Sequence, residues 1–223
     1  MSGAKKLIIA IDGPAGVGKS TVASRVARKL GYVNIESGAM YRALALKAIR
    51  NDVSFDDGPA LARLARKSRI ELQPARDGNR VLLDGENVSG RIREPDVTEA
   101  ASRVSVHPQV REWMVARQRE MGQGGGVVME GRDIGTKVFP DADLKIFLEA
   151  EPAVRSERRL KQHAAPEKAR GAVLEELKER DRRDRTRVAS PLEPAPDAVV
   201  LDTTHLGLEE VLKRVFRLLE GRA

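Results

Sequence analysis

Short apolar runs alternate with amphipathic stretches along the chain, and this alternation predicts the fold. The amphipathic stretches carry apolar side chains at helical spacing, as at Val22, Val26 and Leu30, and Gly31 then favours a helix end. Strands that alternate with helices are typical of a parallel sheet covered by helices on both faces. We therefore expect an α/β fold with a five-stranded parallel sheet, its strands near residues 5–12, 32–35, 127–129, 144–148 and 199–201.

The stretch from residue 70 to residue 88 breaks this rhythm. Its apolar side chains alternate only weakly, and it contains the dipeptides Asp77-Gly78 and Asp84-Gly85. Such dipeptides favour the left-handed backbone of a tight hairpin turn. We therefore expect antiparallel strands here, in a small subdomain inserted between the α/β units.

Residues 151–187 form a densely charged stretch in which Pro152 favours a helix start. It predicts two exposed helices over the sheet. The whole chain carries 40 Lys and Arg against 33 Asp and Glu, a net charge of +7 that favours anionic ligands. Aromatic residues, which stack on unpaired bases in many nucleic-acid-binding proteins, make up only 3%. Charge by itself nevertheless leaves both phosphate monoesters and nucleic acid open as ligands.

Composition excludes several other kinds of site. The chain has no cysteine, which excludes disulfides, thiolate metal sites and a cysteine nucleophile. The apolar run that ends at Asp12 is too short for a signal peptide or a membrane span. We expect a cytoplasmic protein of one domain, since 223 residues suit a single core with modest inserts.

The segment after the first predicted strand carries the strongest chemical signal. Residues 13–20 read GPAGVGKS and match the pattern G-x-x-x-x-G-K-[ST] of a phosphate-binding loop, or P-loop. Glycines let backbone N–H groups converge on phosphate oxygens, and the following helix adds a favourable dipole. Lys19 is placed to reach the β and γ phosphates, and Ser20 to ligate Mg²⁺. Because a strand precedes the motif and a helix follows it, we predict a nucleotide site rather than an ordinary glycine-rich turn.

Clustered arginines indicate that the P-loop takes part in phosphoryl transfer. Phosphoryl transfer to a small anion needs several guanidinium groups, because two highly charged phosphates must approach each other. Arg132 directly follows the strand predicted at 127–129, where open parallel sheets place their ligands, so we favour a functional role for it. A single arginine elsewhere is ordinarily solvated. The remaining candidates are Arg42, Arg155, Arg158, Arg180 and Arg187.

Several stretches together resemble the bacterial-type cytidylate kinases, a family of nucleoside monophosphate kinases. They are IDGPAGVGKST at the first strand, SGAMYRA at 37–43, EGRDIGT at 130–136, ERDRRDRTR at 179–187 and the late strand VVLDTT. They follow the family's order over nearly the whole chain, and the hairpin insert resembles the enlarged nucleotide-binding subdomain of this branch. The resemblance implies a P-loop nucleoside monophosphate kinase fold with a core at 1–60, 103–150 and 188–223, a monophosphate-binding insert at 61–102 and a helical lid at 151–187.

The resemblance also implies roles for individual residues. ATP would bind to Gly13, Pro14, Ala15, Gly16, Val17, Gly18, Lys19, Ser20 and Thr21, with Arg155 and Arg158 from the lid. The acceptor's phosphate would be held by Arg42, Arg132 and Arg187, its ribose by Ser37, Arg180 and Asp184, and its cytosine by Ser102, Arg111 and Asp133. A carboxylate such as Asp133 can accept from the exocyclic amine of cytosine. The candidate catalytic residues are Lys19, Arg132, Asp133 and Arg187. Glu36 departs from the family, which commonly has aspartate there.

The reaction implied is transfer of the γ-phosphoryl group of ATP to CMP or dCMP in line, with Mg²⁺ as cofactor. The acceptor phosphate has a second pKa of about 6 and is therefore already anionic near pH 7, so it needs no strong general base. We expect these nucleotides as partners, no nucleic acid, no membrane, and a monomer. Two alternatives stay open: another small-molecule P-loop kinase, with UMP or a non-nucleotide acceptor, and a nucleic-acid-binding ATPase.

Overall fold

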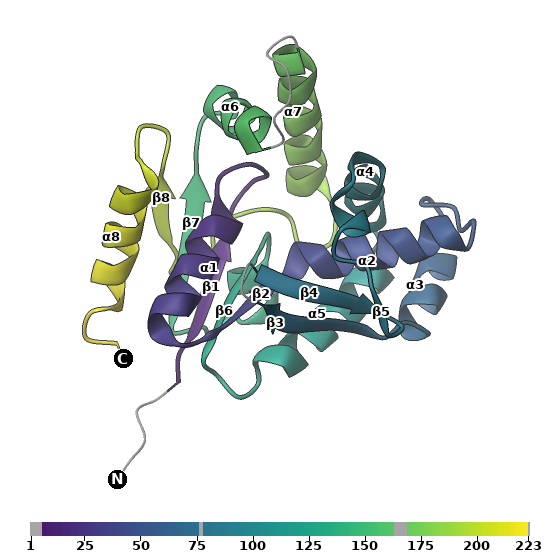
Figure 1. The fold of residues 1–223 in the computed structure, drawn as a ribbon, viewed down its shortest axis with the longest axis horizontal. Helices are drawn as coiled ribbons and strands as arrows, with labels where there is room; N and C mark the ends of the chain where they lie inside the picture. Colours follow the sequence, from purple (N-terminus) through teal and green to yellow (C-terminus); the bar gives the residue numbers. More distant parts are fainter. Residues whose placement is uncertain (1–5, 76–77, 163–168, 223) are drawn as a thin grey trace.

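A five-stranded parallel sheet forms the centre of the molecule (Figure 1). The computed structural model describes residues 6–75, 78–162 and 169–222. The strand order is β2-β6-β1-β7-β8, and every neighbouring pair is parallel, which confirms the predicted sheet. The strands are β1 (Ile8–Asp12), β2 (Val33–Glu36), β6 (Val127–Gly131), β7 (Leu144–Glu149) and β8 (Val199–Asp202).

Helices cover both faces of this sheet, as the sequence predicts. Ile9 and Ile11 of β1 belong to a core shared with α1 (Lys19–Leu30) and α8 (Leu208–Leu219). Ala10, between them in the chain, belongs to a second core on the opposite face, against which α5 (Pro108–Gly122) packs. Because successive strand residues point to opposite faces, an apolar run is buried on both sides only in such a three-layer arrangement.

The hairpin insert contains a second, antiparallel sheet of β3 (Ile70–Ala75), β4 (Gly78–Leu83) and β5 (Glu86–Asn87). Between β4 and β5, Asp84 and Gly85 have φ angles of 51° and 91°, the left-handed backbone that this dipeptide favours. Of the other predicted turn, Asp77 lies outside the described residues. The prediction of antiparallel hairpins is confirmed.

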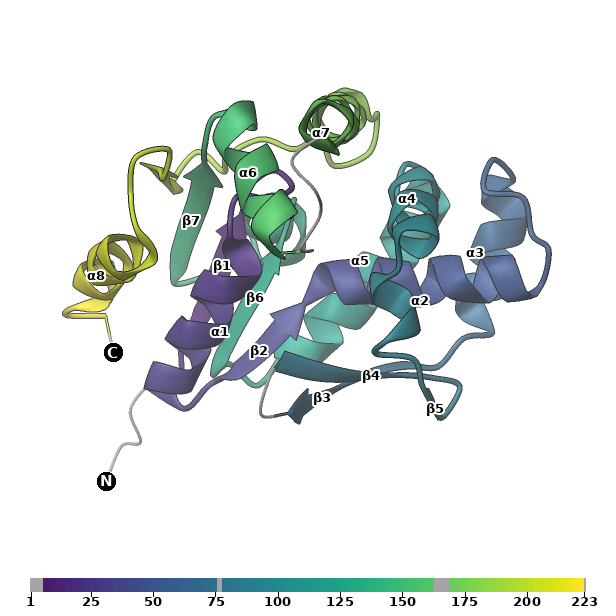
Figure 2. The same ribbon diagram turned by 45° about the horizontal axis from the view of Figure 1, so that its top comes forward.

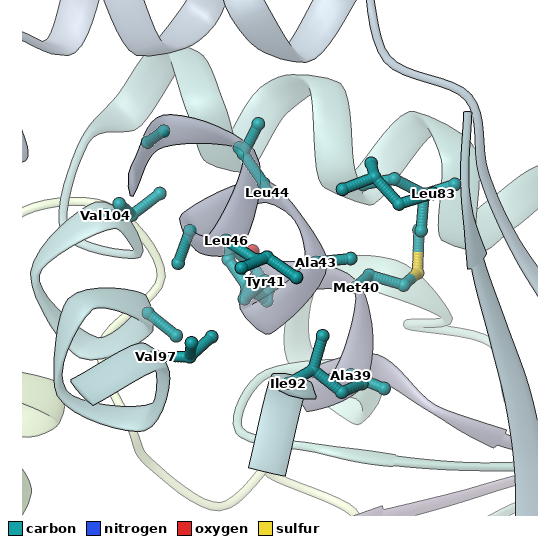
Figure 3. Packing of buried hydrophobic residues seen from close by; sticks show 14 of the residues in the cluster. Ala39, Met40, Tyr41, Ala43, Leu44, Leu46, Leu83, Ile92, Val97 and Val104 are labelled. Carbon is teal, nitrogen blue, oxygen red and sulfur yellow. The ribbon is translucent and has the colours of Figure 1, made fainter. Parts of the chain in front are cut away.

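The insert shares an apolar core with α2 (Ser37–Arg50) and α5. Figure 3 shows Met40 of α2 beside Leu83 of β4, and Val97 and Val104 of α4 (Pro95–Val104) on another side of the same helix. The short turn η1 (Arg91–Arg93) and α3 (Gly58–Arg66) complete this part of the fold. The interior is continuous from α2 into the insert, so the insert is anchored to the helix that follows β2.

The charged stretch folds into α6 (Pro152–Gln162) and α7 (Arg170–Thr186), beyond the carboxyl end of β7 (Figure 1). Two helices were predicted here, but the prediction that they are exposed is wrong in part. Leu160 and Leu177 are buried, and so are the charged side chains of Arg155 and Asp184. Charge density alone could not show this, because these buried charges are paired with other charged side chains. No helix among the described residues is long and apolar enough to cross a membrane.

Candidate active site

A cavity of about 270 Å³ opens at the carboxyl ends of the parallel strands. Its walls come from the P-loop after β1, the start of α2 after β2, the residues after β6, and the helices α4 and α7. Figure 2 shows α4 and α7 standing next to each other beyond this edge of the sheet. Parallel α/β sheets bind ligands outside the carboxyl ends of their strands, so the cavity lies where the fold places a site.

The P-loop has the backbone that its glycines permit. Gly13 has a φ of 145°, and a Cβ atom there would lie 2.2 Å from the carbonyl oxygen of Leu148. Gly18 caps the start of α1 with a φ of 99°. Both positions therefore require glycine, and together they direct the start of α1 at the cavity, where its N–H groups suit a phosphate.

Lys19 begins α1 and is buried against its own loop. Its Nζ donates to the carbonyl oxygen of Pro14 at 2.7 Å. Burial, and next the positive charge of Arg132, lower the pKa of Lys19 to about 7, although Glu130 acts in the opposite direction. A phosphate in the cavity would raise this pKa again, because an anion favours the protonated amine.

Ser20 and Glu130 bring a hydroxyl and a carboxylate together beside Lys19. Ser20 Oγ donates to Glu130 Oε1 at 2.8 Å, and both residues line the cavity. Burial raises the pKa of Glu130, an effect that the nearby Lys19 opposes. Hard oxygen donors of this kind suit Mg²⁺, so the pair fits that ion chemically. The described residues contain no cluster of three acidic or histidine side chains that would hold a metal by themselves.

Arg111 and Asp133 form a buried ion pair that also lines the cavity. Arg111 Nη2 lies 2.5 Å from Asp133 Oδ2, and both side chains are less than a tenth exposed. Arg111 Nη1 also donates to the carbonyl oxygen of Ser105, and its guanidinium lies over the ring of Tyr41, 5.4 Å from the centroid. The pair is therefore fixed in orientation, with Ser102 nearby in the cavity wall.

Asp184 organises a second group of charges. It accepts from Arg132 Nε at 2.9 Å, and Arg187 Nη1 lies 3.4 Å from its other oxygen. Burial raises the pKa of Asp184, but the charges of Arg132, Arg180 and Arg187 outweigh burial and hold it below its usual value. Burial and Arg132 lower the pKa of Arg180 to about 10. One carboxylate thus gathers three guanidinium groups at the cavity.

Positive charge dominates the cavity lining. Seven arginines and Lys19 face four carboxylates, and one of those, Glu36, is paired with Arg42. Glu36 stands at the N-cap position of α2, where its side chain makes no capping hydrogen bond. An excess of fixed cations around one cavity suits a ligand that carries several negative charges.

Several buried polar atoms in the cavity wall have no hydrogen-bond partner within the described part of the chain. They are Tyr41 Oη, Arg42 Nε, Ser102 Oγ, Arg111 Nε and Arg187 Nη2. Leaving a buried polar group unpaired costs about 1–3 kcal/mol each, more for a charged group. Such a concentration at one place is typical of a site whose partners arrive with a ligand.

The structure brings most of the predicted site residues together. Those lining the cavity are Ala15, Gly16, Lys19, Ser20, Ser37, Arg42, Ser102, Arg111, Arg132, Asp133, Arg180, Asp184 and Arg187. Gly13, Pro14, Val17, Gly18 and Thr21 belong to the P-loop or its helix without lining it. Sequence reasoning assigned no role to Tyr41, Arg93, Thr98, Ser105 and Glu130, which also line it. Glu130 could have been found, since it precedes Arg132 at the end of a strand.

Arg155 and Arg158 lie behind the P-loop rather than in the cavity. Arg155 Nη1 donates to the carbonyl oxygen of Ala15 at 2.9 Å, and its Nη2 pairs with Asp181 of α7. Arg158 Nη2 donates to the carbonyl oxygen of Thr203 at 2.6 Å. Both side chains therefore connect α6 to the backbone around the loop.

Comparison with known proteins gives a consistent picture over nearly the whole chain. The sequence model of a family described as cytidylate kinase matches residues 9–221. The chain is 51% identical over 222 residues to the cytidylate kinase of Pelotomaculum thermopropionicum, with 96% of each chain covered. It is 50% identical over 224 residues to the cytidylate kinase of Geobacillus kaustophilus, with 98% of each covered.

Among solved structures, an uncharacterized protein from Eubacterium ventriosum has a similar fold. The TM-score is 0.52 at 11% sequence identity, with 97% of this chain and 99% of the other covered. At this identity the likeness concerns the fold alone.

Proposed function

The chain belongs to the cytidylate kinase family, and on this premise we propose how its residues transfer the γ-phosphoryl group of ATP to CMP and dCMP. One observation carries the proposal: a buried, fixed Arg111–Asp133 pair lies in the same cavity as Lys19 of the P-loop. The Arg111–Asp133 pair can read a base, and Lys19 can hold the phosphates of a donor. The cavity thus supplies both ends of a phosphoryl transfer.

ATP lies on the P-loop, with its phosphates at the N-terminus of α1. Lys19 leaves the carbonyl oxygen of Pro14 and contacts the β and γ phosphates. Ser20, with Glu130 beside it, would hold Mg²⁺, which neutralises charge that develops on the phosphates. Arg155 and Arg158 support the ATP-binding loop from behind, by donating to the carbonyl oxygens of Ala15 and Val17.

The acceptor occupies the rest of the cavity. Its base is read by Ser102, Arg111 and Asp133, because a carboxylate accepts from the exocyclic amine of cytosine while uracil presents a carbonyl there. Arg42, Arg132 and Arg187 hold its phosphate, and Ser37, Arg180 and Asp184 contact its ribose. The unpartnered atoms of Ser102, Arg42 and Arg187 support this placement, since each would gain a hydrogen bond.

Catalysis comes from alignment and charge rather than from a general base. Lys19, Arg132 and Arg187 surround the region between donor and acceptor and stabilise the charge of the transferring group. The lid at 151–187 closes over the site and excludes water, which limits hydrolysis of ATP. The core at 1–60, 103–150 and 188–223 and the insert at 61–102 supply the rest of the cavity wall. A monomer, a cytoplasmic location and the lack of a nucleic-acid partner stay predictions.

Replacing Asp133 with alanine tests the base-reading assignment. We expect the preference for CMP over UMP to fall by ~1–3 kcal/mol, the scale of one good base contact, while the affinity for ATP changes little. The measurement is kcat/KM for CMP and for UMP, with ATP affinity determined separately. Thermal unfolding accompanies it, because the substitution leaves Arg111 buried without its partner. An unchanged preference for CMP in a folded variant would show that Asp133 does not read the base.

A further inference from the structure

A short π-helical turn, η2 (Ile134–Val138), follows directly on Asp133 and is held at both ends by charged side chains. At its start, the backbone N–H groups of Ile134 and Gly135 donate to Asp12 at 2.9 and 2.7 Å, one to each carboxylate oxygen. At its end, Arg119 of α5 donates to the carbonyl oxygens of Lys137 and Val138 at 2.6 and 3.0 Å. Opposite charges thus hold opposite ends of the turn.

Asp12 connects the two halves of the site. It is the last residue of β1, immediately before Gly13 of the P-loop, and it lies opposite Gly131 in the parallel register with β6. Arg132 and Asp133 follow Gly131, and η2 follows them. A hydrogen bond from η2 to Asp12 therefore fixes the backbone that carries the acceptor-binding residues relative to the loop that carries Lys19.

The contacts of Asp12 argue against a direct part in the chemistry. It is buried, does not line the cavity, and uses both oxygens on backbone N–H groups. Burial raises its pKa to about 7, against the two hydrogen bonds, which lower it. A buried carboxylate is costly, and an apolar residue would fill the end of a strand more cheaply.

We propose that Asp12 is a positioning residue that holds Arg132 and Asp133 in register with the P-loop through its two hydrogen bonds to η2. This inference rests on the proposed function, because it concerns the residues assigned to the acceptor. It follows that loss of the carboxylate disturbs the acceptor side of the site more than the ATP side. The two backbone N–H groups would then be buried without a partner, and the turn would shift to satisfy them.

The test is Asp12→Asn, which keeps the size of the side chain but turns an NH₂ group toward one of the two N–H donors. We expect KM for CMP to rise on the order of tenfold, since hydrogen bonds to charged groups are worth this much. The preference for CMP over UMP should fall, and KM for ATP should stay within about twofold of wild type, a difference below 0.5 kcal/mol. Substitution of a residue with a merely structural role would lower Tm without this difference between KM for CMP and KM for ATP.

Asp143→Asn is the matched control. Its carboxylate also accepts a backbone N–H of β1, from Ile8 at 2.8 Å, but at the opposite end of the strand, away from the cavity. We expect this variant to lower Tm and to leave both KM values and the CMP preference unchanged. If Asp12→Asn does not fold, Arg119→Gln, which loosens the other end of η2, should raise KM for CMP in the same direction but less.

The outcomes separate the two proposals. Failure of the wild-type chain to phosphorylate CMP contradicts the proposed function itself. Wild-type activity on CMP, with a folded Asp12→Asn variant whose KM for CMP and CMP preference are unchanged, overturns the positioning role alone. Equal changes in KM for ATP and CMP overturn it too, because they indicate a general effect on the P-loop. If only Arg119→Gln folds, an unchanged KM for CMP in that variant overturns the positioning role.

Discussion

Replacing Lys19 with alanine is expected to lower kcat for phosphoryl transfer on the order of 10²-fold or more, with the fold intact. Lys19 is the first residue of α1, and among the contacts described its Nζ is bound only to a carbonyl oxygen of its own loop. Removal of its side chain therefore leaves no cavity in the apolar core. In the proposed complex, its ammonium group would face the phosphates, where charge moves during transfer. Turnover at saturating ATP and CMP measures the effect, and thermal unfolding confirms the fold.

Lys29→Ala provides the control for this substitution. Lys29 lies on the same helix but in its last turn, where it is exposed, at the opposite end of the helix from Lys19. Its removal takes a lysine from the same helix at an exposed position outside the cavity, so we expect near-normal turnover. Near-normal turnover of folded Lys19→Ala would remove the assigned role of Lys19 in the transition state.

Replacing Arg187 with alanine is expected to lower kcat to a similar extent, on the order of 10²-fold or more, with little loss of thermal stability. Arg187 follows the end of α7 and is buried beside Asp184, yet its Nη2 is among the unpartnered polar atoms of the described residues. Asp184 keeps Arg132 as a partner when Arg187 is removed, which limits the cost in stability. The free Nη2 is what a transferring phosphoryl group would engage.

Arg182→Ala is the matched control on the same segment. Arg182 is exposed and pairs with Glu179 on the outer side of α7, and an ion pair so open to solvent contributes little to stability. We expect kcat within about twofold of wild type for this variant, since its charge is screened by solvent. Equal and small effects of the two substitutions would return the end of α7 to the role of a solvated surface, with Arg42 and Arg132 as the remaining phosphate ligands.

Much of the fold can be predicted because its local signals agree with its tertiary structure. Apolar runs give the strands of the parallel sheet, since such strands are buried on both faces, and Asp84-Gly85 gives a hairpin because its backbone conformation is local. The burial of charged side chains on α6 and α7 could not be predicted in this way. Arg155 is buried because Ala15 and Asp181, distant in the sequence, lie beside it. Nothing in the charge pattern of residues 151–187 contains that information.

In the candidate site, too, some residues could be predicted from the sequence and others could not. The P-loop is a contiguous motif, so Lys19 and Ser20 follow from sequence alone, and the resemblance to a family supplied residues such as Arg111 and Asp133. Two features needed the structure. Glu130 gains its meaning from Ser20, and Asp12 from η2, through contacts that span more than a hundred residues. The register of β1 with β6 creates both, and a sequence pattern does not state which residues of two strands lie opposite each other.

The most direct test of the central claim is an acceptor panel with the full chain, ATP and Mg²⁺, in which nucleoside diphosphate and ADP are both quantified. CMP, dCMP, UMP, AMP and GMP are supplied one at a time, with a parallel set in EDTA and another with added RNA. We expect CMP and dCMP to be converted at least about tenfold faster than the others, as one base contact can provide, and EDTA to abolish conversion. Equal conversion of AMP or GMP, or release of ADP that RNA stimulates without any CDP formed, would contradict it.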